Sequence, residues 1–252
     1  MSPEYITTEG LTPYPDALAA MEQRVTDILD GKAPELLWFL QHPPLYTSGT
    51  SAKQADMLGN MPFPVYDAGR GGQWTYHGPG QRICYLMLDL KARQMMDLRA
   101  YVQMLEQWVI NTLARFGVEA FTREGRIGVW VNQRAGIRSQ GSEFLLDKNG
   151  RPVGRPSLER ASCDLQEQIA EAKIAALGIR VRKWVTFHGI ALNVNPDLSH
   201  YAGIVPCGIS EFGVTSLHDL GITVSMENVD GVLKEEFNRL FSTSISSLSK
   251  QY

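Results

Sequence analysis

A glycine-rich block stands out as a place where this chain could bind a ligand. Residues 69–80 read Gly-Arg-Gly-Gly-Gln-Trp-Thr-Tyr-His-Gly-Pro-Gly. Glycine lets the backbone approach a ligand closely and adopt positive φ, while the other side chains can present polar groups. The pattern is neither a P-loop nor a dinucleotide-binding fingerprint. Because so many glycines weaken a purely structural hairpin, which is the alternative, we predict a shaped binding loop.

A second candidate is a cysteine in an irregular turn. Cys207 lies within Val-Pro-Cys-Gly-Ile, between proline and glycine, where a nucleophile would be accessible. The alternative is a small buried hydrophobic residue, which is the usual role of a free cysteine. Cys84, inside Ile-Cys-Tyr-Leu-Met-Leu, fits that alternative, and Cys163 has no obvious partner. We therefore predict that Cys207 is the reactive thiol.

A reactive thiol needs a nearby cation or base, because its ordinary pKa of roughly 8.5 leaves little thiolate at neutral pH. Lys173, His77 and His188 are candidates, and sequence spacing does not choose among them. A solvated surface role is the alternative for the lysine. Five histidines without metal-ligand spacing predict no catalytic metal.

The elements that must position these residues follow from hydrophobic spacing and turn signals. Apolar periodicity predicts helices over about 15–30, from a cap at Asp97 to Gly117, and after Ser225. Short apolar or alternating runs predict strands over 36–40, 74–76, 83–90, 129–131 and 187–194. In the last of these, alternation places His188 on the side of Ile190, Leu192 and Val194. Short connections between strands favour a mixed sheet with flanking helices, an α+β fold.

Length and charge limit the class of protein. The 252 residues suggest one domain over 1–252, with a polar inserted arm at about 133–167. Lys and Arg number 24 against 27 Asp and Glu, a net charge of −3, which predicts neither nucleic acid nor membrane as partner. No apolar run approaches the ~20 residues of a membrane span. Without a leader pattern, and with scattered cysteines, we expect a cytoplasmic protein.

Taken together, three motifs resemble the bacterial octanoyltransferases, the lipoyl(octanoyl) transferases of lipoate synthesis. They are the glycine block through Gln81, the run from Phe187 to Asn195, and Pro206-Cys207-Gly208, and the similarity extends from about Leu36 to Leu220. The resemblance implies a fold like that of biotin and lipoate protein ligases, with a core like that of class II synthetases. It implies acyl transfer from octanoyl-acyl carrier protein to a lysine of a lipoyl domain, in 2-oxoacid dehydrogenase complexes or the glycine cleavage H protein, without ATP or another cofactor.

The resemblance also assigns roles to residues. The acyl-thioester cysteine matches Cys207, and the activating lysine matches Lys173. The substrate-binding segments match Arg70, Gly71, Gly72, Gln73, Trp74, Thr75, Tyr76 and His77, then Ala176, Leu177 and Gly178, and finally Gly189, Ile190 and Ala191.

Further roles are hypotheses from chemistry. Tyr76, Leu177 and Ile190 are expected as walls of an apolar slot for the acyl chain. His77 and backbone N–H groups near Gly78 or Gly208 are expected to orient the acyl carbonyl. A docking rim for acidic carrier and lipoyl domains is expected from basic side chains, namely Arg70, Arg82, Arg180, Arg182 and Lys183.

The chain departs from the family in two places. The 41 residues from Asn132 to Ala172 stand where the family runs almost directly from strand to lysine, and Ala176 stands where serine is common. The alternatives are an ATP-dependent lipoate or biotin-type ligase, which has no use for a thiol at position 207, and a catalytically idle acyl-binding module.

Overall fold

The computed structural model describes residues 2–59, 61–134, 169–204 and 213–247. Within these ranges the helices are α1 (Tyr14–Leu29), α2 (Leu98–Arg115) and α3 (Met226–Ser247), with short 3-10 turns η1 (Gln54–Asp56) and η2 (Leu198–Gly203). The strands are β1 (Glu4–Leu11), β2 (Leu36–Gln41), β3 (Leu45–Ser48), β4 (Val65–Asp67), β5 (Thr75–His77), β6 (Gln81–Met87), β7 (Ala120–Arg123), β8 (Arg126–Arg134), β9 (Ile169–Arg182), β10 (Val185–Asn193) and β11 (Gly213–Val214).

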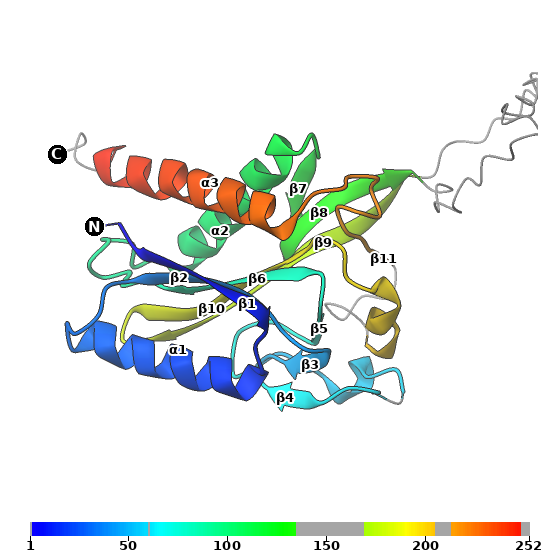
Figure 1. The fold of residues 1–252 in the computed structure, drawn as a ribbon, viewed down its shortest axis with the longest axis horizontal. Coiled ribbons are helices and arrows are strands. Elements are labelled where there is room, and N and C mark those ends of the chain that lie inside the picture. The colour runs from blue at the N-terminus through cyan, green and yellow to red at the C-terminus, as the bar shows by residue number, and fades with distance from the viewer. Residues whose placement is uncertain (1, 60, 135–168, 205–212, 248–252) are drawn as a thin grey trace, which may run out of the picture.

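A large mixed sheet is the centre of the fold (Figure 1). Its strand order is β1-β2-β6-β10-β9-β8-β7, and β11 adds to β9. The β1–β2 and β9–β11 pairs are parallel, whereas the neighbours from β2 to β7 are antiparallel. Every residue of β6 and β10 is buried, as expected for central strands covered on both faces. The mixed sheet and the α+β class predicted from the sequence are confirmed.

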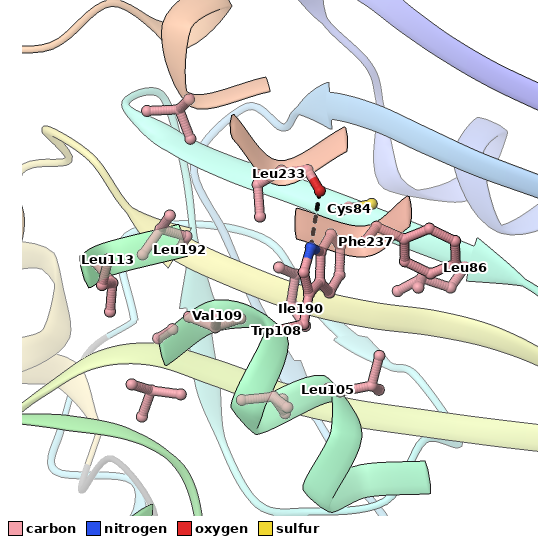
Figure 2. Close-up of a cluster of buried hydrophobic side chains, with 14 of the residues drawn as sticks. Cys84, Leu86, Leu105, Trp108, Val109, Leu113, Ile190, Leu192, Leu233 and Phe237 are labelled. Carbon is pink, nitrogen blue, oxygen red and sulfur yellow. Dashed lines mark hydrogen bonds between the residues drawn. The ribbon is translucent and has the colours of Figure 1, made fainter. Parts of the chain in front are cut away.

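Helices cover both faces of this sheet (Figure 1). On one face α1 packs Ala17, Met21 and Val25 against residues of β2, β6 and β10. The spacing of four residues places these three side chains on one side of the helix. On the other face α2 and α3 pack against the sheet and each other, and the Trp108 indole N–H donates to the Leu233 carbonyl at 2.8 Å (Figure 2). The sheet is therefore rigidly held where its central strands carry candidate site residues.

A smaller sheet, in the order β4-β3-β5, lies at one end of the large one (Figure 1). The predicted glycine-rich loop joins β4 to β5, so this sheet holds both of its ends. The loop folds back onto β9, where the Gly71 amide donates to the Ile179 carbonyl at 2.9 Å. This contact brings the loop beside the large sheet.

The helices predicted from periodicity are confirmed, including two of their caps. The Asp97 carboxylate accepts from the Arg99 and Ala100 amides at 2.9 and 3.1 Å, and the Ser225 hydroxyl accepts from the Asn228 amide at 3.2 Å. The strands predicted at 36–40, 83–90, 129–131 and 187–194 correspond to β2, β6, β8 and β10, while the one at 74–76 begins one residue later as β5. The sequence pattern predicts neither β1 nor β9.

The placement of His188 differs from the prediction. Its backbone has φ of 61°, so its ring leaves the side shared by Ile190 and Leu192. The ring instead stacks beside Phe187, 5.4 Å away between centroids, on the face covered by α1. A left-handed backbone at one position breaks the alternation on which the prediction rested.

The predicted arm at 133–167 falls almost wholly on residues outside the described ranges. Its two ends belong to β8 and β9, which pair as neighbours up to Arg134 opposite Ile169. The insertion therefore lies at the open end of an antiparallel strand pair. Among the described residues, no helix is both long and apolar enough to cross a membrane.

Candidate active site

A cavity of about 290 Å³ opens between the glycine-rich loop and strands β9 and β10. The register of these strands explains its walls, because Leu177 pairs with Ile190 and Gly178 pairs with Gly189. The two predicted segments, 176–178 and 189–191, therefore lie side by side in one hairpin. The predicted site residues that line the cavity are Arg70, Gly72, Gln73, Trp74, Thr75, His77, Lys173, Ala176, Leu177, Gly178, Gly189, Ile190 and Ala191.

Arg70 holds the glycine-rich loop in shape. Its guanidinium donates to the Thr47 hydroxyl at 2.7 Å, to the Thr47 carbonyl at 3.3 Å, and to the carbonyls of Gly71 and Gln73 at 3.0 and 3.2 Å. Gly178 lets this cluster approach β9, because a Cβ there would lie 2.7 Å from the Arg70 Cδ and 3.0 Å from the Gly71 oxygen. The buried arginine thus joins β3, the loop and β9 on one side of the cavity.

Lys173 lies in the cavity wall and is buried, with 6% of its surface exposed. Its Nζ donates to the Ile127 carbonyl at 2.7 Å and lies 5.3 Å from the centre of the Trp130 ring. Immediately after it, the pairing of β8 and β9 shifts by one residue, since Val129 faces Ala175 while Trp130 faces Lys173. Such bulges re-aim side chains and are common beside active sites. The lysine is therefore held at the cavity by both strands.

Three histidines at or near the cavity, His42, His77 and His188, are buried and neutral. Burial lowers the pKa of His42 to about 4 and, with nearby arginines, that of His188 to about 3. Burial also lowers the pKa of His77 well below its ordinary value. His42 bonds the Tyr85 hydroxyl at 2.7 Å, and the Tyr14 hydroxyl lies 3.2 Å from the His188 Nε2. Of these groups, His77, His188, Tyr14 and Tyr85 line the cavity.

A hydrogen-bond chain fixes the tautomer of His77. The Asn193 amide nitrogen donates to the Thr215 carbonyl at 2.8 Å, and the Asn193 oxygen accepts from Gln81 at 3.0 Å. The remaining Gln81 oxygen must accept from the His77 Nδ1, 3.1 Å away. The Nε2 of this neutral ring is then an acceptor. Orienting an acyl carbonyl would require a donor, so with this tautomer His77 is suited instead to accept from an N–H group of a substrate; its role stays a prediction.

Two predicted binding residues lie outside the cavity lining. Tyr76 alternates with its neighbours in β5 and points away, packing against Tyr46 and Phe63, with its hydroxyl 2.8 Å from the His200 Nδ1. It is therefore not a wall of the slot. Gly71 acts through its backbone bond to β9.

The predicted rim of five basic residues is also corrected. Arg70 is buried in the loop cluster, and Arg82 is buried against Asp230, 2.7 Å away on α3. Arg180, Arg182 and Lys183 do lie together, at the end of β9 and in the turn that follows.

Of the cysteines, only Cys84 falls within the described ranges; Cys207, Gly208 and Cys163 lie outside them. Cys84 is fully buried, and burial raises the pKa of its thiol well above the ordinary value, as predicted for a core residue. The chain on either side of Cys207 is described at Ile204 and Gly213. Val214, the next residue, pairs with Lys173 and lines the cavity.

Sequence reasoning missed several cavity residues. Tyr14, Tyr85, Asn193 and Tyr201 line it, yet each belongs to an element predicted only for its apolar pattern or to a turn. A tyrosine on an apolar helix face was the available signal, because a buried hydroxyl needs a partner. Among the described residues, no three His, Cys, Asp or Glu side chains gather in a way that could hold a metal ion.

The sequence profile of the lipoyl protein ligase A/B catalytic domain matches residues 13–238. An octanoyltransferase from Brucella melitensis is 52% identical over 94% of this chain and 80% of its own length. One from Dinoroseobacter shibae is 51% identical over 94% of this chain and 96% of its own. The chain belongs to the octanoyltransferase family. The family resemblance drawn from the three motifs is therefore confirmed.

Solved structures show the same fold in more distant proteins. A bipartite lipoate protein ligase from Thermoplasma acidophilum has a TM-score of 0.61 at 16% identity, covering 96% of this chain and 84% of that one. A lipoate-protein ligase A bound with ATP has a TM-score of 0.58 at 16% identity, with coverages of 96% and 86%. The predicted lipoate-ligase-like fold is confirmed.

Proposed function

We propose that this acyltransferase moves an octanoyl group from octanoyl-acyl carrier protein to a lysine of a lipoyl domain through an acyl thioester on Cys207. The observation that carries the proposal is Lys173, a buried amine in the wall of a cavity that apolar residues and glycines also line. The sequence similarity to octanoyltransferases supports octanoyl transfer as the reaction. The residues that line the cavity support a route through a thioester on cysteine.

Covalent connectivity supports Cys207 as the nucleophile. Three peptide steps separate it from Ile204 and seven from Val214, the partner of Lys173. At no more than about 3.6 Å per residue, these links allow Cys207 to reach the cavity that Lys173 and Val214 line. Cys84 is an unsuitable alternative, because its thiol is buried in the core.

The first step is a thioester exchange. The Cys207 thiolate attacks the octanoyl carbonyl, forming a new C–S bond as the bond to the carrier's thiol breaks. The departing carrier thiolate takes a proton from the Lys173 ammonium and leaves as a thiol. Because one thioester replaces another, the donor is already activated and no ATP is required.

The second step forms the amide. A neutral lysine amine of the lipoyl domain attacks the Cys207 thioester, and the C–S bond breaks with its electrons returning to sulfur. The surplus amine proton passes to the neutral Lys173, restoring an ammonium beside a thiolate. His77 lines the same cavity with an acceptor nitrogen, which suits it to steer the incoming N–H groups.

Apolar residues of β9 and β10 suit an alkyl chain. Leu177, Ile190 and Ala191 line the cavity, and each methylene buried there contributes about 0.8 kcal/mol. Ala176 also lines the cavity, and Thr47 and Ser51 supply hydroxyl groups to it. Chain-length preference is then set by how far this apolar wall extends.

The donor and the acceptors follow from the family. We propose acyl carrier protein as donor, and as acceptors the lipoyl domains of 2-oxoacid dehydrogenase complexes and the glycine cleavage H protein. Their acidic surfaces would meet the basic group of Arg180, Arg182 and Lys183. Arg180 is exposed and lies 3.8 Å from Glu22, a long ion pair that a partner's carboxylate can replace.

The experiment that tests this route is an intact-mass measurement. After incubation with octanoyl-acyl carrier protein, the wild type should retain one octanoyl group, Cys84→Ala should retain it too, and Cys207→Ala should retain none. Product that requires ATP and forms without an adduct would identify a ligase instead. Absence of both adduct and product would leave only an acyl-binding protein.

A further inference from the structure

One peptide group lies between the proposed activating lysine and a buried carboxylate. The Ile127 carbonyl accepts from the Lys173 Nζ at 2.7 Å, and the Gly128 amide of that same peptide donates to the Glu106 carboxylate at 3.0 Å. Lysine, peptide and glutamate therefore form a single hydrogen-bonded row. It joins β9, the start of β8 and α2.

Glu106 is fixed by the core on which its helix lies. It is 7% exposed, and its neighbours on α2, Leu105, Trp108 and Val109, are buried against the sheet and α3 (Figure 2). Burial raises the pKa of the Glu106 carboxyl, while the Gly128 amide and the Lys173 charge act in the opposite direction. These two partners compensate part of the free-energy cost of burying the Glu106 carboxylate.

Gly128 makes the row possible. A Cβ at this position would lie 2.1 Å from the Lys173 Cε and 2.7 Å from its Nζ. Its φ of 140° also disfavours other residues. The lysine side chain therefore runs directly across this peptide, and only glycine leaves room for it.

Hydrogen bonds in a row polarise one another. A carboxylate that accepts from the peptide N–H draws electron density toward the peptide oxygen, which then becomes a stronger acceptor for the ammonium at its other end. The position of the ammonium at this carbonyl is thereby fixed.

We propose that Glu106 is a positioning residue for Lys173, holding the ammonium toward the cavity through the Ile127–Gly128 peptide. This inference rests on the proposed function, since it takes Lys173 to be the group that stabilises the Cys207 thiolate. Glu106 does not line the cavity and touches no substrate there.

Other charges near Lys173 come from the strands packed beside it. On β8, Arg126 lines the same cavity and carries the same charge as the lysine. On β9, Glu171 is paired with Arg123 of β7. On α2, Glu106 is directed at the lysine's peptide partner. Removing the charge of Glu106 therefore tests the contribution of this hydrogen-bonded row by itself.

The test is the pH dependence of Cys207 alkylation, measured without substrate in a Cys84→Ala/Cys163→Ala background. Lys173→Ala should raise the alkylation midpoint most. Glu106→Gln, which can still accept from the Gly128 amide, should raise it in the same direction by roughly half a unit. Glu106→Asp, which keeps the charge, should restore part of the difference. Glu124→Gln removes an exposed carboxylate from the turn before β8 and should change nothing.

A double variant shows whether Glu106 acts through the lysine. Adding Glu106→Gln to Lys173→Ala should have no further effect, because the route is already broken. A midpoint unchanged by Glu106→Gln, or an equal further shift in the double variant, would overturn the proposal.

A reciprocal measurement covers the case in which Glu106→Gln does not fold. Lys173→Met should raise the pKa of the Glu106 carboxyl, followed by ¹³C resonance, and an unchanged value would also overturn the proposal. Since neither assay uses an acyl donor, failure here is distinct from an absent octanoyl adduct in the wild type.

Discussion

At the scale of single residues, the proposed reactivity of the Cys207 thiol depends on a buried amine, that of Lys173. Lys173 contacts the Ile127 carbonyl and the Trp130 ring. Burial lowers the effective dielectric around its charge, which strengthens its interaction with an anion in the cavity. An ammonium a few ångströms from a thiol favours the thiolate.

Lys173→Ala should therefore shift the pH midpoint of Cys207 alkylation upward by roughly one to two units. Lys91→Ala, an exposed lysine in the turn after β6, is the matched control and should leave the profile unchanged. Superimposable profiles for wild type and Lys173→Ala would remove the lysine from the mechanism.

The buried histidines make stability depend on pH. Because the folded pKa values of His42 and His188, about 4 and about 3, lie below the unfolded value near 6.5, the unfolded state binds more protons at pH 5–6. The stability that these two neutral histidines contribute is fully present above about pH 6.5. It is lost as the pH falls toward their pKa values in the folded protein. We expect roughly 1–2 kcal/mol lost per histidine between pH 7 and 5.

Melting temperatures between pH 5 and 7.5 check this expectation. His188→Asn, which tolerates the positive φ, should flatten the profile, whereas His218→Asn, at an exposed position, should leave its slope unaltered. Parallel profiles for wild type and His188→Asn would show that His188 is not held neutral.

The sequence predicted which residues are buried or lie in the loop better than it predicted where their side chains point. The core role of Cys84 follows from its apolar neighbours and is confirmed. The glycine-rich block forms a shaped loop as predicted, but Tyr76 was expected in the slot and does not line the cavity. The direction of the Tyr76 side chain is set by the pairing of β5 with β3, and the hydrogen-bond partner of His77 is Gln81; both contacts form only in the folded chain.

At the scale of elements, β9 carries Lys173 and forms one wall of the cavity, yet the sequence pattern does not predict it as a strand. Ile-Ala-Glu-Ala-Lys-Ile-Ala-Ala-Leu-Gly is rich in residues that favour helices rather than strands. Pairing on both sides, with β8 and β10, overrides that preference. Strand propensity depends on neighbours, so local pattern predicted β10 but could not predict its partner.

Gly178→Ala should disrupt the contact between β9 and the glycine-rich loop. The added methyl group meets the Arg70 Cδ and the Gly71 carbonyl, so the loop must shift, at a cost of roughly 1–3 kcal/mol. Octanoyl loading of Cys207 should slow at least tenfold while circular dichroism stays near that of the wild type.

Gly231→Ala is the control for this substitution. It lies in α3 with no atom within 4 Å of the new methyl group, and alanine favours a helix by about 0.5–1 kcal/mol. It should retain loading and melt slightly higher. Equal loading by Gly178→Ala and Gly231→Ala would show that loop position does not control the reaction.

At the scale of the whole molecule, a net charge of −3 coexists with a local basic group at the end of β9. Encounter with an acidic carrier depends on such local fields, which salt screens within about 10 Å. Arg180→Gln/Arg182→Gln/Lys183→Gln should therefore lower kcat/KM for octanoyl-acyl carrier protein roughly fivefold at low salt.

The rate of acyl transfer at saturating carrier should stay the same in that triple variant, because the charges act on encounter. Lys91→Gln serves as control. A kcat/KM that responds neither to salt nor to the triple variant would place carrier docking elsewhere on the surface.

The overall architecture could be predicted from motifs and connection lengths, because short links between strands require antiparallel neighbours. Strands β3 and β4 of the small sheet and the addition of β11 to β9 could not, since strands of two to four residues leave almost no periodic signal. Their positions are determined by long-range pairing.

The pairing of β8 with β9, which extends to Arg134 opposite Ile169, affects how this chain can tolerate insertions. Strand register is already set before residues 135–168 begin, so the chain can gain or lose length at that point without moving Lys173. Loop-closure cost grows only with the logarithm of length. This end of the β8–β9 pair is thus a point where a further module can be inserted while Lys173 keeps its position in the sheet.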